Sequence, residues 1–468
     1  MHAETAYVFR HALLRAAAYQ LHLPGDRARL HALAVDFIEA HCGGPPAERP
    51  LDAAGTSEFV PHATDPFAEE LAAHARIAGT PASAPALRRY LRRAAEYGER
   101  QYRHEAAFAS WKSLAELLAA DERGVALRRA AIVSWTLGRA AETQELFDRA
   151  LAMHRASGHR RLEGVVLSNL ANIYQAGDRS AEAERAYEAA IALSRETGDR
   201  DSEGIALANL GELYRRTGRA AEAERALEQA LVIDRETGDR SAEGFALGNL
   251  AYLYYEAGRY EQSERAYERA LAFDREFGDR RIEGVALGNL GLLFMKTGRP
   301  DSAERAYEQA LSLHREAGNR RSEAFTLSNL SSLYMKSGRN CEAEPMCERA
   351  VALHREFGAR RFEGVALGNL ASLYHATGRL EAAERGFEQA FALLRQAGDR
   401  RSEGLFQCDL ALLLVQRRRF EDARRAWKTA CDFLRNTADA AELERQETAL
   451  REACDQAGVT PFDEAGHG

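Results

Sequence analysis

The most distinctive polar feature of the sequence is an asparagine that recurs every forty residues. Asparagine is a poor helix former, so its recurrence within a helical pattern indicates a specific role. A primary amide both donates and accepts hydrogen bonds, which suits the backbone of a bound peptide. The same amide also suits a neighbouring helix, in which case the row would brace the protein. The row comprises Asn169, Asn209, Asn249, Asn289, Asn329 and Asn369, with Asp409 in the last copy.

Basic and aromatic residues share the helical face of these asparagines. Lys296 and Lys336 occupy equivalent positions in adjacent copies, and helix stacking would place them about 10 Å apart. Such a pair suits acidic side chains or a terminal carboxylate of a partner. Two solvated surface charges are the simpler alternative. The other candidate binding residues on this face are Arg215, Arg216, Tyr252 and Tyr255.

No pattern in the sequence favours catalysis, a metal site or a bound cofactor. The six cysteines lack C-x-x-C spacing, and no histidine forms a tight cluster with cysteines or carboxylates. The motifs G-x-S-x-G, H-E-x-x-H and G-x-G-x-x-G do not occur. We therefore expect a non-enzymatic protein with no cofactor and no metal ion.

Composition narrows the range of partners. Acidic residues number 71 and basic residues 63, so the net charge is −8 and no nucleic-acid partner is expected. No run of about 18 apolar residues predicts a membrane helix, and the first ten residues lack the order of a secretory signal. Scattered cysteines in a chain of 468 residues are typical of reduced thiols, which predicts a cytoplasmic location.

The asparagines belong to an internal repeat of about forty residues, which begins near residue 161 and continues to about 440. A more degenerate copy of the repeat covers 121–160. In the copy at 202–240, Leu207, Leu210 and Tyr214 form one helical stripe, and a second follows from Ala223. Gly238 comes after the last turn, where a left-handed cap is favoured. One helix pair cannot bury its own apolar face, so the pattern predicts an all-α solenoid of stacked helix hairpins.

These repeats resemble the tetratricopeptide repeat (TPR), and their length is similar to that in kinesin light chain and Pins-type adaptors. The resemblance implies a right-handed α-solenoid of antiparallel hairpins whose concave groove binds a peptide or helix of a protein partner. It places the asparagine row and the neighbouring arginines, tyrosines and lysines in that groove. The residues that carry it are Leu210, Gly211 and Tyr214 on a first helix, and Ala303, Tyr307 and Ala310 on a second.

The N-terminal eighty residues resemble a different family. Tyr7–Tyr19, followed by Arg27, Leu30 and His31, is similar to a winged-helix-like region of bacterial signalling ATPases of the STAND type, which lies just after their nucleotide-binding domain. No G-x-x-x-x-G-K-[ST] occurs, and no lysine precedes Lys112, so this chain cannot form a P-loop.

The sequence thus predicts a helical or winged-helix-like segment at 1–80 with a proline-rich connector at 43–66. A TPR solenoid follows at 85–440, with degenerate repeats at 85–160 and regular ones at 161–440. A capping helix at 441–457 and a flexible tail at 458–468 complete the chain. The expected function is a protein–protein interaction scaffold for a protein or peptide partner, with an acidic peptide suiting the lysines. The alternative is the ligand-sensing half of a signalling system whose ATPase (NTPase) or cyclase domain is on another chain.

One repeat departs from the pattern. Pro345 takes the place that Arg305 and Arg385 hold in the flanking copies, within the second helix. A proline there loses a helical hydrogen bond and its ring clashes with the carbonyl of Cys341, unless the helix starts late. We expect the repeat at 321–360 to be the weakest of the array.

Overall fold

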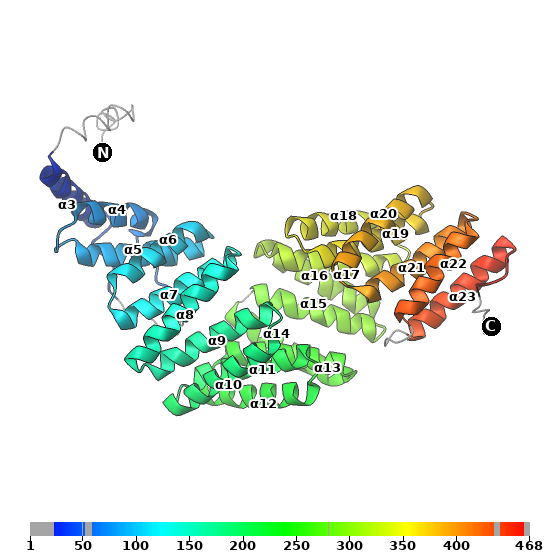
Figure 1. The fold of residues 1–468 in the computed structure, drawn as a ribbon, viewed down its shortest axis with the longest axis horizontal. Coiled ribbons are helices and arrows are strands. Elements are labelled where there is room, and N and C mark those ends of the chain that lie inside the picture. Colours follow the sequence, from blue (N-terminus) through cyan, green and yellow to red (C-terminus); the bar gives the residue numbers. More distant parts are fainter. Residues whose placement is uncertain (1–22, 49, 52–58, 279, 435–439, 463–468) are drawn as a thin grey trace. The chain divides into compact units, whose positions relative to one another are not determined.

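The computed structural model describes residues 23–48, 50–51, 59–278, 280–434 and 440–462. Its described residues form helices and no strand (Figure 1). They divide into two units, residues 1–239 and 240–468, which are described separately. None of the described helices is long and apolar enough to cross a membrane. The motif at Tyr7–Tyr19 lies outside the described residues.

The first unit contains the N-terminal helices and the first repeats. Each repeat consists of a first helix, here called the A helix, and a second one, the B helix. The helices are α3 (Pro24–His41), η1 (Asp65–Phe67), α4 (Ala68–Ala78), α5 (Ala84–Arg100), α6 (His104–Leu117), α7 (Ala120–Thr136), α8 (Ala140–Ser157), α9 (Arg160–Ala176), α10 (Ser180–Thr197), α11 (Arg200–Arg216) and α12 (Ala220–Thr237).

The second unit continues with the same alternation and ends with an additional helix. The odd-numbered helices from α13 to α21 are A helices, and the even-numbered ones from α14 to α22 are B helices. They are α13 (Arg240–Glu256), α14 (Tyr260–Phe277), α15 (Arg280–Lys296), α16 (Pro300–Glu316), α17 (Arg320–Lys336), α18 (Asn340–Glu356), α19 (Arg360–Ala376), α20 (Leu380–Gln396), α21 (Arg400–Gln416), α22 (Phe420–Leu434) and α23 (Ala440–Ala457).

Tight turns end the helices where the sequence predicts them. Gly238 follows α12 with a φ of 75°, in the left-handed region that glycine enters without a steric penalty. The next helix is capped by a polar side chain in several copies. Asp199, for example, accepts a hydrogen bond from the backbone N–H of Ser202 at the start of α11. These local signals fix the hairpin length at forty residues.

Glycines allow the two helices of a hairpin to pack closely. A Cβ added at Gly204 of α11 would lie 2.5 Å from Asp234 Oδ1 on α12, and one at Gly284 would lie 2.7 Å from His314 Cε1. Gly244, the first glycine of a G-x-x-x-G pattern, likewise faces its B helix. Gly248 and Gly288, which lie four residues after Gly244 and Gly284, differ because a Cβ added at either would meet no B-helix atom within 4 Å.

Successive repeats are joined by an ion pair that spans the glycine turn. An arginine in the last turn of a B helix reaches a buried glutamate in the first turn of the next A helix, eight residues later. Arg195 Nε lies 2.6 Å from Glu203 Oε1, and the Glu203 side chain is only 3% exposed. The arginine at the C-terminal end of one helix and the glutamate at the N-terminal end of the next also interact favourably with the dipoles of those helices. The equivalent pairs are Arg155–Glu163, Arg275–Glu283, Arg315–Glu323, Arg355–Glu363 and Arg395–Glu403.

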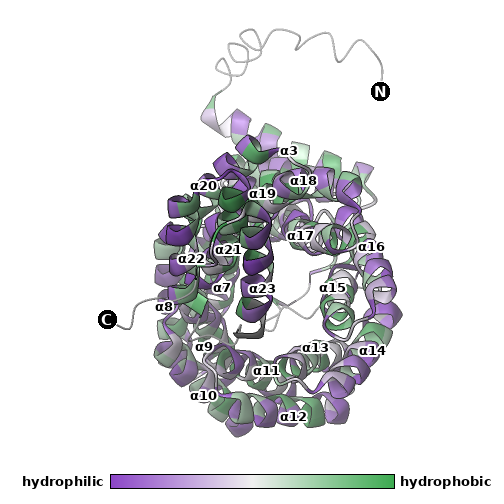
Figure 2. Ribbon diagram, turned by 90° about the vertical axis from the view of Figure 1, so that its right-hand side faces the viewer, coloured by the Kyte–Doolittle hydropathy of each residue, from purple (hydrophilic) through white to green (hydrophobic). Residues whose placement is uncertain are grey.

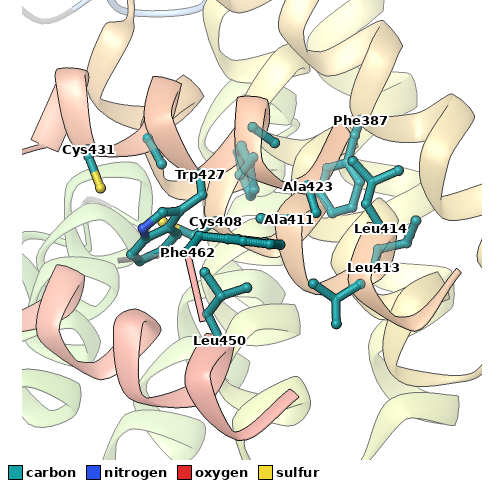
Figure 3. Close-up of a cluster of buried hydrophobic side chains, with 14 of the residues drawn as sticks. Phe387, Cys408, Ala411, Leu413, Leu414, Ala423, Trp427, Cys431, Leu450 and Phe462 are labelled. Atoms are coloured by element: carbon teal, nitrogen blue, oxygen red, sulfur yellow. The ribbon is translucent and has the colours of Figure 1, made fainter. Parts of the chain in front are cut away.

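The C-terminal end of the second unit is closed by α23 and the residues that follow it. Leu450 of α23 and Phe462 are buried in a cluster with Trp427 of α22 (Figure 3). Phe462 thus packs against the last hairpin, within the segment 458–468 that the sequence predicts to be a flexible tail. An aromatic side chain covers the last hairpin there, and burying it stabilises the end of the stack.

The N-terminal segment is helical in its described part, which contains no wing strands. The proline-rich connector is held to α5 by charged contacts. Asp65, which is buried, accepts two hydrogen bonds from the Arg93 guanidinium at 2.7 and 2.6 Å. Arg93 also donates to the carbonyl of Val60 at 3.0 Å.

Pro345 lies within a helix that has already formed. Helix α18 begins at Asn340, so the proline falls after its first turn and the late-start alternative is excluded. The Pro345 ring therefore removes a backbone donor from an established helix.

We expect Pro345→Arg to stabilise the second unit, by up to about 3 kcal/mol, because it restores the missing backbone donor. Urea unfolding followed by circular dichroism measures the change. Arg305→Pro at the matching position of α16 is the reciprocal control and should destabilise the protein. An unchanged midpoint for Pro345→Arg would contradict the expectation.

The Arg195–Glu203 ion pair between repeats leads to a second prediction. Glu203→Gln should cost about 1–3 kcal/mol because the buried carboxylate loses its charge-assisted bonds, while Arg195 is half exposed and regains water. Glu222→Gln, which disrupts the much less buried Arg219–Glu222 pair, should change the urea midpoint less. Equal shifts for the two variants would show that the buried pair is not a main support of the array.

Candidate functional site

Each A helix has an exposed or half-buried stripe along one face. On α11 this stripe comprises Asp201, Ile205, Asn209, Glu212 and Arg216, a spacing of three or four residues that defines one helical face. Successive A helices of the second unit contact one another. Figure 2 shows α13, α15 and α17 on the inner side of that unit, with the B helices α14 and α16 outside. Within each unit, the exposed stripes of successive A helices therefore form one continuous surface, here called the A-helix face of that unit.

The asparagine row lies on this face, and every member is partly buried. Some members bond the neighbouring A helix. Asn169 Oδ1 accepts from Arg128 Nη1 at 3.3 Å, and Asn369 Nδ2 donates to Ser332 Oγ at 3.4 Å. Asp409 accepts from Ser372 Oγ at 2.5 Å. At these positions the side chain links consecutive repeats.

The central members of the row differ. Asn209, Asn289 and Asn329 make no side-chain hydrogen bond to any other described residue. Asn249 Nδ2 is buried and has no partner among the described residues. A buried amide without a partner costs free energy, which applies to Asn249, and all four side chains retain unused hydrogen-bonding capacity. In the second unit, three consecutive members of the row have this property.

A row of apolar residues accompanies the asparagines, and we did not identify it from the sequence. It lies four residues before each asparagine, one helical turn away on the same face. Ile205, Phe245 and Val285 are 44%, 42% and 40% exposed, although such residues are normally buried. The signal in the sequence is that this position is apolar in every regular copy. The full row is Val165, Ile205, Phe245, Val285, Phe325, Val365 and Leu405.

Two glycines open the surface between these rows. Gly248 and Gly288 lie directly before Asn249 and Asn289. A Cβ added at Gly248 would meet no atom within 4 Å, and one at Gly288 would approach only Thr326 Oγ1, at 3.8 Å. Glycine in a helix interior costs about 1 kcal/mol relative to alanine. Neither close packing nor a turn requires it here, so space on the A-helix face is the remaining explanation.

Aromatic side chains border the face at one end of the second unit. The ring centroids of Tyr252 and Tyr255 are 5.9 Å apart, and Tyr260 of α14 lies 6.2 Å from Tyr255. Burial raises the pKa of Tyr255, so its hydroxyl remains protonated at neutral pH. The structure thus brings both predicted tyrosines together and adds a third.

The two lysines end adjacent A helices. Lys296 is the last residue of α15 and Lys336 the last of α17, where a cation is favoured by the helix dipole. Both are exposed, and neither forms an ion pair with a described residue. They occupy equivalent edges of the same face and remain available to an anion.

The two predicted arginines belong to the first unit. Arg215 is held by Glu212 through two contacts of 2.7 Å. Arg216 reaches Asp178 and the Gln175 carbonyl, each at 3.3 Å, so it links α11 to the end of α9. These contacts within the protein explain both arginines without a ligand.

Within the part of the chain that the structure describes, no three His, Cys, Asp or Glu side chains are placed to hold a metal ion. The face presents amides, apolar groups, hydroxyls and two free ammonium groups. Such a surface can bind an extended or helical chain.

The fold is that of a helical-hairpin repeat protein whose A helices line one face. The chain belongs to the tetratricopeptide repeat family, which matches it at residues 122–196, 162–236, 202–276, 241–316, 282–356 and 322–396. No curated protein matches the chain.

Solved structures share the fold at low sequence identity. A STAND signal-transduction ATPase with a tetratricopeptide repeat sensor, from Pyrococcus horikoshii, is 16% identical over 92% of this chain and 67% of its own, with a TM-score of 0.54. A Rap protein complexed with competence and sporulation factor is 15% identical over 81% of this chain and 99% of its own, with a TM-score of 0.52. A putative kinesin light chain of Podosopora anserina is 20% identical over 41% of this chain and 95% of its own, with a TM-score of 0.35.

The bonding pattern of the row predicts different roles for its members. Asn169→Ala should lower stability by about 1 kcal/mol because the buried Arg128 loses an acceptor. Asn329→Ala removes no bond and introduces a better helix former, so stability should stay equal or rise. Thermal unfolding of both variants provides the test. A similar loss for both would mean that Asn329 also braces the array.

Proposed function

We propose that the protein is a non-enzymatic interaction scaffold whose A-helix face in the second unit binds a peptide segment of a protein partner. One observation carries the proposal: the consecutive amides of Asn249, Asn289 and Asn329 have no partner within the described protein. They lie beside an exposed apolar row and two glycines that leave space. The peptide complex of the structurally similar Rap protein supports this use of the fold.

The distance between adjacent A helices suggests how a bound peptide would lie on the A-helix face. Packed helices are about 8–10 Å apart, and an extended chain advances about 3.3 Å per residue. An extended peptide running across the A helices would therefore meet one asparagine about every three residues. The amides would bond its backbone, while the apolar row, which includes Phe245 and Val285, would contact its side chains. Lys296 and Lys336 favour acidic residues on the ligand.

The decisive variants fill the space beside the asparagines. Gly248→Leu/Gly288→Leu should abolish peptide binding, because two large side chains would occupy the surface that the backbone needs. Stability should not fall, since leucine is the better helix former and the added Cβ atoms meet no close neighbour. The ligand is a peptide selected from a displayed random library against the full chain. Affinity is measured by calorimetry, and unchanged affinity in this variant would refute the proposal.

Two further variants separate the amides from the charges. Asn249→Ala/Asn289→Ala should weaken every selected peptide by more than tenfold, at about 1 kcal/mol for each lost bond. Lys296→Ala/Lys336→Ala should weaken only acidic peptides, and the effect should fade in high salt. Arg265→Ala/Arg385→Ala, on exposed positions of B helices, is the charge-matched control. If the asparagine variant melts earlier but binds normally, the row braces the repeats and its role in binding is wrong.

A second function is that of a sensor acting on a separate ATPase or cyclase. The similarity to the STAND ATPase extends over 92% of this chain. This function requires that binding to the partner depend on the nucleotide bound there. Affinity capture with and without ATP distinguishes it from a simple scaffold.

A further inference from the structure

The first unit contains a cavity that the peptide-binding proposal does not use. Its volume is about 750 Å³, which is large enough for a nucleotide-sized molecule. It lies along α5, with the connector on one side and α6 and α7 on the other. Six arginines line it in a chain whose net charge is −8. They are Arg88, Arg89, Arg92, Arg93, Arg100 and Arg129.

Four of these arginines are bound by carboxylates of the protein. Three of them come from α5 and also hold the connector, as Arg92 does by donating to the Pro50 carbonyl at 3.0 Å. A purely structural role is therefore sufficient for them. The pairs are Arg89–Glu48, Arg92–Glu96, Arg93–Asp65 and Arg129–Glu99.

The remaining two arginines have no such role. Arg88 and Arg100 are exposed, line the cavity and form no ion pair with a described residue. They lie near the two ends of α5, about 18 Å apart along its axis at 1.5 Å per residue. Arg100 makes one further contact, with its guanidinium 4.8 Å from the centre of the Phe59 ring. Each thus keeps free donors of the fork geometry that binds phosphate or carboxylate.

The remaining lining residues indicate the shape and charge of a ligand. Leu51 and Phe59 form an apolar wall on the connector side, and Leu118 adds an apolar contact on the opposite side, so part of the ligand can be organic. Glu122 of α7 is exposed and has no arginine partner, which would oppose an anion close to it. Negative charge on the ligand is therefore favoured near α5 and disfavoured near Glu122.

We propose that this cavity binds a small organic polyanion, whose phosphate or carboxylate groups contact Arg88 and Arg100 while its body packs on the apolar wall. The site is separate from the A-helix face and does not depend on peptide binding.

Calorimetry on the full chain tests the site with three probes: ATP, inorganic triphosphate and citrate. Adenosine is the uncharged control. At least one polyanion should bind, and its affinity should fall with salt because charge drives the contact. A preference for ATP and triphosphate over citrate would identify a phosphate ligand, and the reverse a carboxylate. Absence of binding by all three probes at millimolar concentration would overturn the proposal.

Two double variants test whether the probe binds at Arg88 and Arg100. Arg88→Ala/Arg100→Ala should weaken the bound probe by at least tenfold and leave the unfolding temperature of the free protein nearly unchanged, since both side chains are exposed. Arg185→Ala/Arg225→Ala removes the same charge from exposed positions of α10 and α12 and should leave affinity unchanged. Amide hydrogen exchange should slow in α5 when the probe is added. Equal weakening in both variants, or protection elsewhere, would show non-specific attraction and refute the site.

Discussion

The buried glutamate at the start of six A helices, α9, α11, α15, α17, α19 and α21, forms the interaction that joins consecutive repeats. It accepts from the arginine that ends the preceding B helix, and this pair spans the left-handed glycine turn. A carboxylate that is at least nine-tenths buried would be expensive without that partner. The pair therefore fixes where each hairpin begins relative to the previous one. Because it recurs at the same position in these helices, they begin at equivalent points and present corresponding residues on one face.

The proposed function of the A-helix face rests on this packing. Once the other sides of an A helix are buried, only one residue in three or four remains free for binding. In the second unit those positions carry an apolar row and an amide row, beside residues that change from copy to copy. Constant amides suit a constant peptide backbone, and variable neighbours such as Tyr252, Leu292 and Ser332 suit particular side chains. Glycine serves two opposite purposes in the same helices: Gly284 admits a side chain of the B helix, whereas Gly288 leaves open space.

In the N-terminal helices, charged side chains attach a connector instead of joining repeats. Arg89, Arg92 and Arg93 hold the connector against α5 through Glu48, Pro50 and Asp65. The same row then leaves two guanidinium groups without carboxylates beside a sizeable cavity. The proposed polyanion site is thus a consequence of how the connector is attached, and it lies in a unit distinct from the proposed peptide surface.

The sequence by itself determined the helices, the forty-residue hairpin and the family, because these depend on local signals that recur in register. Gly238, the stripe from Leu207 to Tyr214 and the repeated N-L pattern each predict structure from neighbours within a few residues. Only the tertiary structure decided which asparagines brace the repeats, since that depends on residues about forty positions away such as Arg128 and Ser332. It likewise showed that Phe245 and Val285 are exposed, that Phe462 is buried, and that α18 begins before Pro345. The sequence could not decide these points, because burial and hydrogen-bond partners depend on contacts between helices rather than on the residue types within one.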